Sequence, residues 1–313
     1  MIDIVSIVGA SGFIGREVVD YFVENKIKVK ILIDSQSKLL NFKKLDYIIC
    51  YEKSPFDEDI PIEFFESDVL INCFGSMNGI SLTYRSNVLV PKNLINQGFK
   101  KIKKFIQISS VSVYDFEDNI DIIDENSKIL PQNIYELSKA ISETIILNLT
   151  EKHSIKCVIL RPSNVVGAKM KNNSFRQLIN LVKYGIFFYV HKDDYISNYL
   201  NVKDLANAVF KCSILIHTNG IFNLSDDCTY KKLIGIITKS LKIKSRKKIL
   251  PINIAYLICS IFKLFRMNLL TKSRIKHLTN KKRINIRKIK KEIGYEIVYG
   301  LEDAVSKIIK SDL

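Results

Sequence analysis

The sequence has few cysteines, none of them closely spaced, and no long apolar run. Its six cysteines form no Cys-x-x-Cys pair and no histidine stands near them at metal-ligand spacing. This pattern excludes a zinc finger, so we expect reduced thiols and no bound metal. No apolar run reaches the ~18 residues that a membrane span requires. The first residues lack the basic stretch of a signal peptide, so we expect a cytoplasmic protein.

Acidic residues are missing from residues 231–291, a segment with 20 lysines and arginines and no aspartate or glutamate. The rest of the chain is close to neutral, so this segment accounts for the net charge of +16. A basic face can attract substrate phosphates, an anionic membrane or nucleic acid, or can be a solvated surface. We do not expect nucleic acid as a partner, because no RNA-binding motif with interleaved aromatic residues is present.

The order of apolar runs along the chain predicts the fold class. Hydrophobic residues make up 47% of the 313 residues, enough for a sizeable core. Short β-branched runs alternate with helical patterns, which predicts an α/β fold with a Rossmann-type doubly wound parallel sheet. The expected strands are 3–8, 29–33, 47–50, 69–73, 104–108, 157–160, 199–202 and 221–224. The expected helices are 13–24, 84–97, 135–152, 175–184 and 202–213.

A glycine-rich turn follows the first expected strand and opens the first expected helix. Its glycines are Gly9, Gly12 and Gly15. The first permits a tight turn, the second lets a pyrophosphate approach backbone N–H groups, and the third allows close packing of helix on strand. The helix N-terminus also attracts phosphate, so we predict a dinucleotide site. The same turn adds Ser11, Phe13 and Ile14 to the predicted cofactor contacts.

Asp34 ends the second expected strand, 19 residues after Gly15. An acidic residue about 20 residues after this turn binds the ribose 2′-hydroxyl of the dinucleotide. Its charge would repel the 2′-phosphate of NADP, so we expect NAD. NADP stays open, because the nearby Lys38 could reverse this preference, and Asp34 could also be a turn residue.

Tyr135 and Lys139 lie four residues apart in an expected helix, so both side chains are on one face. An ammonium held beside a phenol favours the phenolate and lowers the pKa of the phenol. A tyrosine with such a pKa can transfer a proton near neutral pH. The pair therefore predicts a proton-transfer site, in which Tyr135 is the general acid/base.

An ordered series of motifs extends through most of the chain. The motifs are Gly9–Gly15, Val69–Gly75, Asn87-Val88, Ser109–Tyr114, Asp124–Asn126, Pro131, Tyr135–Lys139, Arg161–Gly167 and Tyr199–Ala206. The series resembles the extended short-chain dehydrogenases/reductases, in particular the sugar-nucleotide epimerase/dehydratase group. An NAD-dependent enzyme is implied, and the resemblance is more specific for the family than for the substrate.

The resemblance implies roles for individual residues. Tyr135 would be the general acid/base, Lys139 would lower its pKa and hold the nicotinamide ribose, and Ser110 would bond the reacting oxygen. These three form the predicted catalytic set. Further cofactor contacts are implied for Asn72, Cys73, Asn87 and Pro162. Substrate contacts are implied for Ser112, Tyr114 and Asn164.

The resemblance also implies a division of the chain and a set of partners. We expect residues 1–167 to form the NAD-binding domain, with segments near 198–224 returning to it. Residues 168–197 and 225–313 would form a smaller, basic, mostly helical substrate-binding part. We expect a nucleotide-sugar substrate and a homodimer, and we consider a peripheral membrane contact through residues 231–291.

Departures from the family pattern limit the choice of reaction and substrate. Val111 and Ser112 stand where sugar dehydratases carry acidic residues, so we do not expect a dehydratase. A 4-epimerase and a 4-keto reductase both stay open. Ser197 stands where many members have an arginine for the nucleotide diphosphate. A membrane-associated enzyme for a lipid-linked sugar or sterol-like alcohol is an alternative, suggested by the apolar stretch 252–265, and a non-catalytic NAD-binding scaffold is another.

Overall fold

A computed structural model describes most of the chain. The described residues are 2–33, 42, 45–116, 121–170, 174–190, 195–244, 249–251, 253–254 and 279–311. Asp34 and Lys38 therefore lie outside the described residues, as does the apolar stretch 252–265 except for Asn253 and Ile254. No helix among the described residues is both long enough and apolar enough to cross a membrane.

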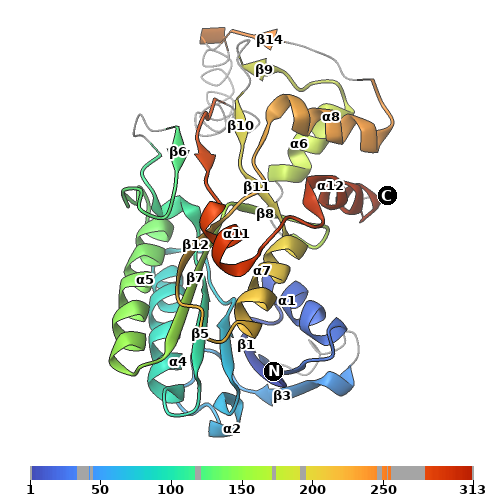
Figure 1. The fold of residues 1–313 in the computed structure, drawn as a ribbon. Helices are drawn as coiled ribbons and strands as arrows, with labels where there is room; N and C mark the ends of the chain where they lie inside the picture. Colours follow the sequence, from blue (N-terminus) through green and yellow to red (C-terminus); the bar gives the residue numbers. More distant parts are fainter. Residues whose placement is uncertain are drawn as a thin grey trace.

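A seven-stranded parallel sheet forms the centre of the protein (Figure 1). Its strands are β1 (Ile4–Val8), β2 (Lys28–Ile33), β3 (Ile48–Glu52), β4 (Val69–Asn72), β5 (Lys104–Ile108), β7 (Lys156–Pro162) and β12 (Gly220–Leu224). They lie in the order β12-β7-β5-β4-β1-β2-β3. The chain moves outward from β1 to β3 and then returns to β4 on the other side of β1. This reversal confirms the predicted doubly wound fold.

Helices cover both faces of the sheet (Figure 1). On one face lie α1 (Phe13–Glu24) and α7 (Val202–Ile214), whose Val18 and Leu205 belong to one apolar cluster. On the other face lie α2 (Ile62–Phe65), α4 (Val90–Gly98) and α5 (Ile134–Lys152), where Leu94 and Ile146 belong to a second cluster. Successive strand residues alternate between the two clusters, as buried parallel strands require.

A smaller lobe lies beyond the carboxyl ends of the strands (Figure 1). Its helices α6 (Ser174–Lys183), α8 (Tyr230–Leu241) and α12 (Gly300–Ser311) pack around a separate core that includes Phe175, Leu233 and Val305. Short strand pairs lie outside the central sheet. They are β8 (Asn164–Val166) with β11 (Tyr199–Asn201), β10 (Ile196–Ser197) with β13 (Cys228–Thr229), β9 (Tyr189–Val190) with β14 (Ile249–Leu250), and β6 (Ile122–Ile123) with β15 (Arg283–Ile284).

The sequence pattern located the strands of the sheet well and the short strands poorly. Every predicted strand of the sheet is present within two residues of its expected ends. The helix expected at 84–97 begins earlier, as α3 (Ile80–Tyr84), and continues through a π-helical turn, η3 (Arg85–Leu89), into α4. Of the short strands that the structure describes outside the central sheet, only β11 was expected, at 199–202. The division into cofactor-binding and substrate-binding parts stays a prediction, although β12 does return to the sheet beside β7.

Candidate active site

The glycine turn between β1 and α1 leaves no room for a side chain at Gly9 or Gly15. Gly9 has a φ of +80°, and a Cβ there would lie 2.6 Å from the backbone nitrogen of Phe74. A Cβ on Gly15 would lie 2.1 Å from the Gly9 carbonyl oxygen, which also accepts a hydrogen bond from the Gly12 N–H at 3.0 Å. Only glycine fits the two outer positions, and the turn brings α1 directly against the loop that follows β4.

The first turn of α1 suits an anionic ligand. Gly12 is its N-cap, no side chain caps the helix, and no acidic residue lies in the first turn. Uncapped N–H groups at a helix N-terminus favour phosphate. The Phe13 and Ile14 side chains pack into apolar clusters, so these two residues can offer only backbone groups to a pyrophosphate. The turn therefore fits a dinucleotide, as predicted from its sequence.

The end of β4 forms the second wall of the site. Asn72 is fully buried, donates to Gln107 Oε1 at 2.9 Å and accepts from the Phe74 N–H at 3.0 Å. Its amide thus shapes the loop after β4. Burial raises the pKa of the neighbouring Cys73 thiol to about 12, so this thiol is neutral and unreactive at physiological pH.

Asn87 joins that loop to helix α5. It lies in the π-helical turn η3, a feature often found at functional sites. Its Nδ2 donates to the Ser76 carbonyl and to Ser138 Oγ, each at 2.9 Å, and its Oδ1 accepts from the Ser76 N–H at 3.0 Å. The amide thereby fixes the loop against the helix that carries Tyr135.

Gly75 is a site residue that the sequence analysis did not assign. A Cβ there would lie 2.8 Å from Asn87 Oδ1 and 3.4 Å from Lys139 Nζ. Only a glycine lets the loop after β4 pack this closely against the Asn87 amide and the Lys139 ammonium. Its position just after β4, within the Val69–Gly75 motif, was the available signal, since glycine after a parallel strand often allows a ligand to approach the backbone.

The structure brings Ser110, Tyr135 and Lys139 together at the carboxyl edge of the sheet. Ser110 follows β5 and caps the 3-10 turn η4 (Val111–Val113), where its Oγ accepts from the Ser112 N–H at 3.1 Å. Tyr135 lies in the first turn of α5 and forms a hydrogen bond with the Ser110 side chain. One turn later, Lys139 Nζ lies 5.9 Å from the centroid of the tyrosine ring.

The expected lowering of the Tyr135 pKa by Lys139 is wrong for this structure. Burial raises the pKa of the phenol, and the hydrogen bond with Ser110 opposes that rise. The Lys139 ammonium donates to the Ile108 carbonyl at 3.0 Å instead of to the phenol. Burial also lowers the pKa of Lys139 to about 8. At neutral pH, Tyr135 is therefore a protonated phenol and Lys139 is mostly charged.

Tyr114 lies away from solvent, although a substrate contact was expected for it. It is 1% exposed, its hydroxyl donates to Asn223 Oδ1 at 2.9 Å, and Arg161 Nη1 donates to that hydroxyl at 2.6 Å. The sequence pattern could not show this, because Arg161 and Asn223 lie 47 and 109 residues further along the chain. Its part in substrate binding stays a prediction.

The remaining predicted residues differ in exposure. Asn164 is exposed in β8, and its Nδ2 donates to the Asn198 carbonyl at 3.2 Å. Pro162 is buried at the end of β7, in register with Leu224. The Ser112 hydroxyl is buried and has no hydrogen-bond partner among the described residues. Their contacts with cofactor or substrate stay predictions.

Comparison with known proteins agrees with this geometry. The model of the NAD dependent epimerase/dehydratase family matches residues 5–224. The decarboxylating sterol-4-alpha-carboxylate 3-dehydrogenase of Dictyostelium discoideum is 24% identical over 317 residues, covering 93% of this chain and 95% of the relative.

Two solved structures show the same fold. The UDP-glucose 4-epimerase of Thermotoga maritima with UDP-glucose has a TM-score of 0.72 at 18% identity, covering 99% of this chain and 98% of that one. The UDP-glucuronic acid 4-epimerase of Bacillus cereus with NAD has a TM-score of 0.74 at 16% identity, covering 98% and 96%.

Proposed function

This chain belongs to the NAD dependent epimerase/dehydratase family, and we propose that it is a 4-epimerase of a nucleotide-activated sugar in which Tyr135 transfers the proton. The observation that carries the proposal is the meeting of Ser110, Tyr135 and Lys139 at the carboxyl edge of the sheet. The UDP-sugar 4-epimerases with the same fold support the choice of substrate class.

Each residue of the set has a chemical task. NAD, when bound, supplies the hydride acceptor, while the protein handles the proton. The neutral phenol of Tyr135 can donate its proton to a keto oxygen, and the phenolate can take it back from a hydroxyl. The hydrogen bond with Ser110 favours that phenolate. Glycines 9, 12 and 15 would hold the pyrophosphate against α1.

The structure supports an epimerase or reductase over a dehydratase. Elimination of water needs an acid and a base beside the sugar in addition to the tyrosine. Val111 packs in a small apolar cluster, and Ser112 offers only a hydroxyl. The region that carries acidic residues in sugar dehydratases is therefore apolar or neutral here.

The test is Tyr135→Phe, with Tyr184→Phe as the matched control on an exposed tyrosine of the lobe. UDP-glucose and UDP-galactose would be supplied to the NAD-loaded protein, and their interconversion followed by chromatography. Loss of the phenol proton should lower turnover about 10²–10⁴-fold, while the control should retain wild-type activity. Equal turnover by the Tyr135→Phe protein would refute the assignment. Steady NADH consumption with a 4-keto sugar would identify a reductase instead.

A second candidate is a dehydrogenase for a sterol-like alcohol or a lipid-linked sugar at a membrane surface. It is favoured by the sterol dehydrogenase that aligns with 93% of the chain. It is also favoured by the lobe, since the described segments 174–190 and 230–244 contain no acidic residue. NADH formation with a 3-hydroxysterol in detergent, and salt-sensitive binding to phosphatidylserine vesicles, would establish this function. Failure of both assays would eliminate it.

We also propose that a second copy of the chain covers α3 and α5. Exposed apolar side chains lie on both helices, among them Ile80, Leu82, Leu137 and Ile141. Such apolar groups on adjacent helices are typical of a self-complementary interface. Leu82→Glu with Ile141→Glu should shift the sedimenting species from dimer to monomer. A wild-type protein that sediments as a monomer at micromolar concentration would contradict the proposal.

A further inference from the structure

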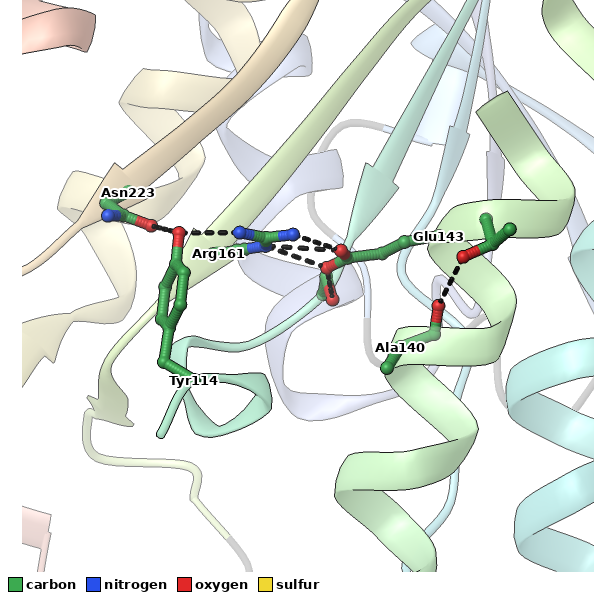
Figure 2. A network of polar contacts seen from close by, with 7 residues as sticks. Tyr114, Ala140, Glu143, Arg161 and Asn223 are labelled. Carbon is green, nitrogen blue, oxygen red and sulfur yellow. Dashed lines mark hydrogen bonds and ion pairs between the residues drawn. The ribbon is translucent and has the colours of Figure 1, made fainter. Parts of the chain in front are cut away.

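A buried ionic network centres on Glu143 and Arg161 and extends to Tyr114 and Asn223 (Figure 2). Arg161 Nε lies 3.0 and 3.2 Å from the two carboxylate oxygens of Glu143, and Arg161 Nη2 lies 2.5 Å from Oε2. The two side chains are 1% and 4% exposed. Removing two charges from water is costly and does not by itself stabilise a fold, so a buried pair of this kind calls for a specific role.

The network connects four separate segments that end at the carboxyl edge of the sheet. Glu143 belongs to α5 and Arg161 to β7. Ser109, the residue before Ser110, donates its hydroxyl proton to Glu143 Oε1. On the other side, Arg161 reaches the Tyr114 hydroxyl after η4 and, through it, Asn223 of β12 (Figure 2). The pair therefore holds both ends of the short segment that presents Ser110.

The carboxylate also acts on Lys139. Glu143 lies four residues after Lys139, which lies four residues after Tyr135, so the three side chains follow one face of α5. Burial is the main effect on the Lys139 pKa and lowers it, while Glu143 raises it. The Cys73 thiol is the other group that raises it. Glu143 is the carboxylate that opposes the loss of the ammonium charge.

We propose that Glu143 and Arg161 are positioning residues, which keep the Lys139 ammonium charged and hold the Ser110 segment against α5. The proposal rests on the roles given to Ser110 and Lys139 in the proposed function. Arg161 fixes the carboxylate, and the carboxylate acts on the lysine and on Ser109. Neither residue is required to touch substrate or cofactor.

The test measures the pH dependence of NADH affinity by fluorescence titration, which requires no substrate turnover. In the wild type, affinity should fall as Lys139 loses its proton near pH 8. Glu143→Gln keeps the size of the side chain and removes its charge. The pH of that fall should move down by about one unit, the usual effect of losing a neighbouring opposite charge. Lys139→Met should abolish the step and thereby identify it.

A double variant separates this role from a purely structural one. Glu143→Met with Arg161→Met replaces the pair by apolar side chains, an exchange that buried ion pairs often tolerate. We expect a folded protein that still shows the lowered pH step. A double variant with both the wild-type melting temperature and the wild-type pH step would overturn the proposal. The double variant also tests the proposal if the Glu143→Gln protein does not fold.

Two further comparisons make the outcome specific. Lys104→Met alters a buried charge at the opposite end of β5, so it should lower stability without moving the pH step of NADH affinity. If it moves the step equally, the proposal fails, because general destabilisation would explain the result. If Tyr135→Phe retains full activity while Glu143→Gln still shifts the step, the proposed function fails and the positioning role stands.

Discussion

Two lysines at opposite edges of the sheet provide an instructive comparison. Lys104 begins β5 at the amino edge, and Lys139 lies beside the end of β5 at the carboxyl edge. Both are at most 5% exposed, and burial lowers the pKa of each to about 8. Their titration is therefore alike, although only Lys139 is a candidate for chemistry.

The difference lies in what surrounds each lysine. Lys104 Nζ donates to the carbonyl oxygens of Cys212 and Leu215, at 2.5 and 2.8 Å, and so caps the C-terminus of α7. Lys30 binds the carbonyl oxygens of Glu63 and Glu66 at the end of α2 in the same way. Lys139 also donates to a carbonyl oxygen, that of Ile108, but it lies beside the Tyr135 ring and has a carboxylate one turn away. A lowered lysine pKa alone thus does not identify a site.

The largest expected effect is a loss of NADH affinity when one methyl group is added to the glycine turn at the carboxyl edge of the sheet. Gly15→Ala places a Cβ 2.1 Å from the Gly9 carbonyl oxygen, so the turn must open. We expect the affinity for NADH to fall at least about 100-fold, because the pyrophosphate site is the turn itself. Isothermal titration calorimetry measures the loss. Unchanged affinity would show that the dinucleotide does not depend on this turn.

The next effect tests whether the amino edge is purely structural. Lys104→Met leaves the Cys212 and Leu215 carbonyl groups without their donor, which should cost about 2 kcal/mol of unfolding free energy. Turnover per folded molecule should stay at the wild-type value, since the residue lies far from the carboxyl edge. Urea denaturation and an activity assay test both statements. A fall in turnover with unchanged stability would contradict the purely structural role that we assign to Lys104.

Alkaline pH should stabilise the protein over a narrow range. Between pH 8 and 10.5 the unfolded chain keeps protons that Lys104 and Lys139 lose in the folded protein, so stability rises with pH. Above pH 9 the thiols of Cys73 and Cys212, whose pKa desolvation raises to about 12, act in the opposite direction. We expect a gain of about 1 kcal/mol from pH 8 to 9 in urea denaturation, reduced in Lys104→Met. A fall over this range would contradict the assignment.

The smallest expected effect is at Gly235, a glycine that no other segment approaches closely. Gly235 lies in α8 of the lobe, and a Cβ there meets no atom within 4 Å. Gly235→Ala should stabilise the protein by roughly 0.5–1 kcal/mol, because alanine loses less conformational freedom in a helix. Thermal unfolding measures it. A lower melting temperature of the Gly235→Ala protein would contradict this prediction and would indicate that another segment contacts α8 at this position.

Local sequence signals were sufficient for the sheet and for much of the site. The apolar runs of β1 to β5, β7 and β12 are long enough to be distinct, and the i, i+4 spacing of Tyr135 and Lys139 is a property of any helix. The series Tyr135, Lys139 and Glu143 continues the same spacing. The sequence could therefore have predicted that Glu143 lies on the active-site face of α5, but it could not have predicted that Arg161 pairs with it.

The remaining features depend on contacts between distant segments. Arg161 could not be matched to Glu143, because the two lie on different elements and meet only when β7 packs beside β5. Burial of the whole site reversed the expected direction of the Tyr135 pKa. The two-residue strands outside the central sheet and the three-residue β8 are too short to show a period of two.

The π-helical turn at Arg85–Leu89 makes the direction of the Asn87 amide depend on the number of residues before it. A π turn arises where a helix accommodates one additional residue without changing its ends. Each residue of an α-helix rotates the following side chain by about 100°. Deletion of one residue before Asn87 would therefore turn its amide away from Ser76 and Ser138 while leaving α4 in place. The connection between the β4 loop and α5 thus depends on the number of residues in this turn as well as on their identity.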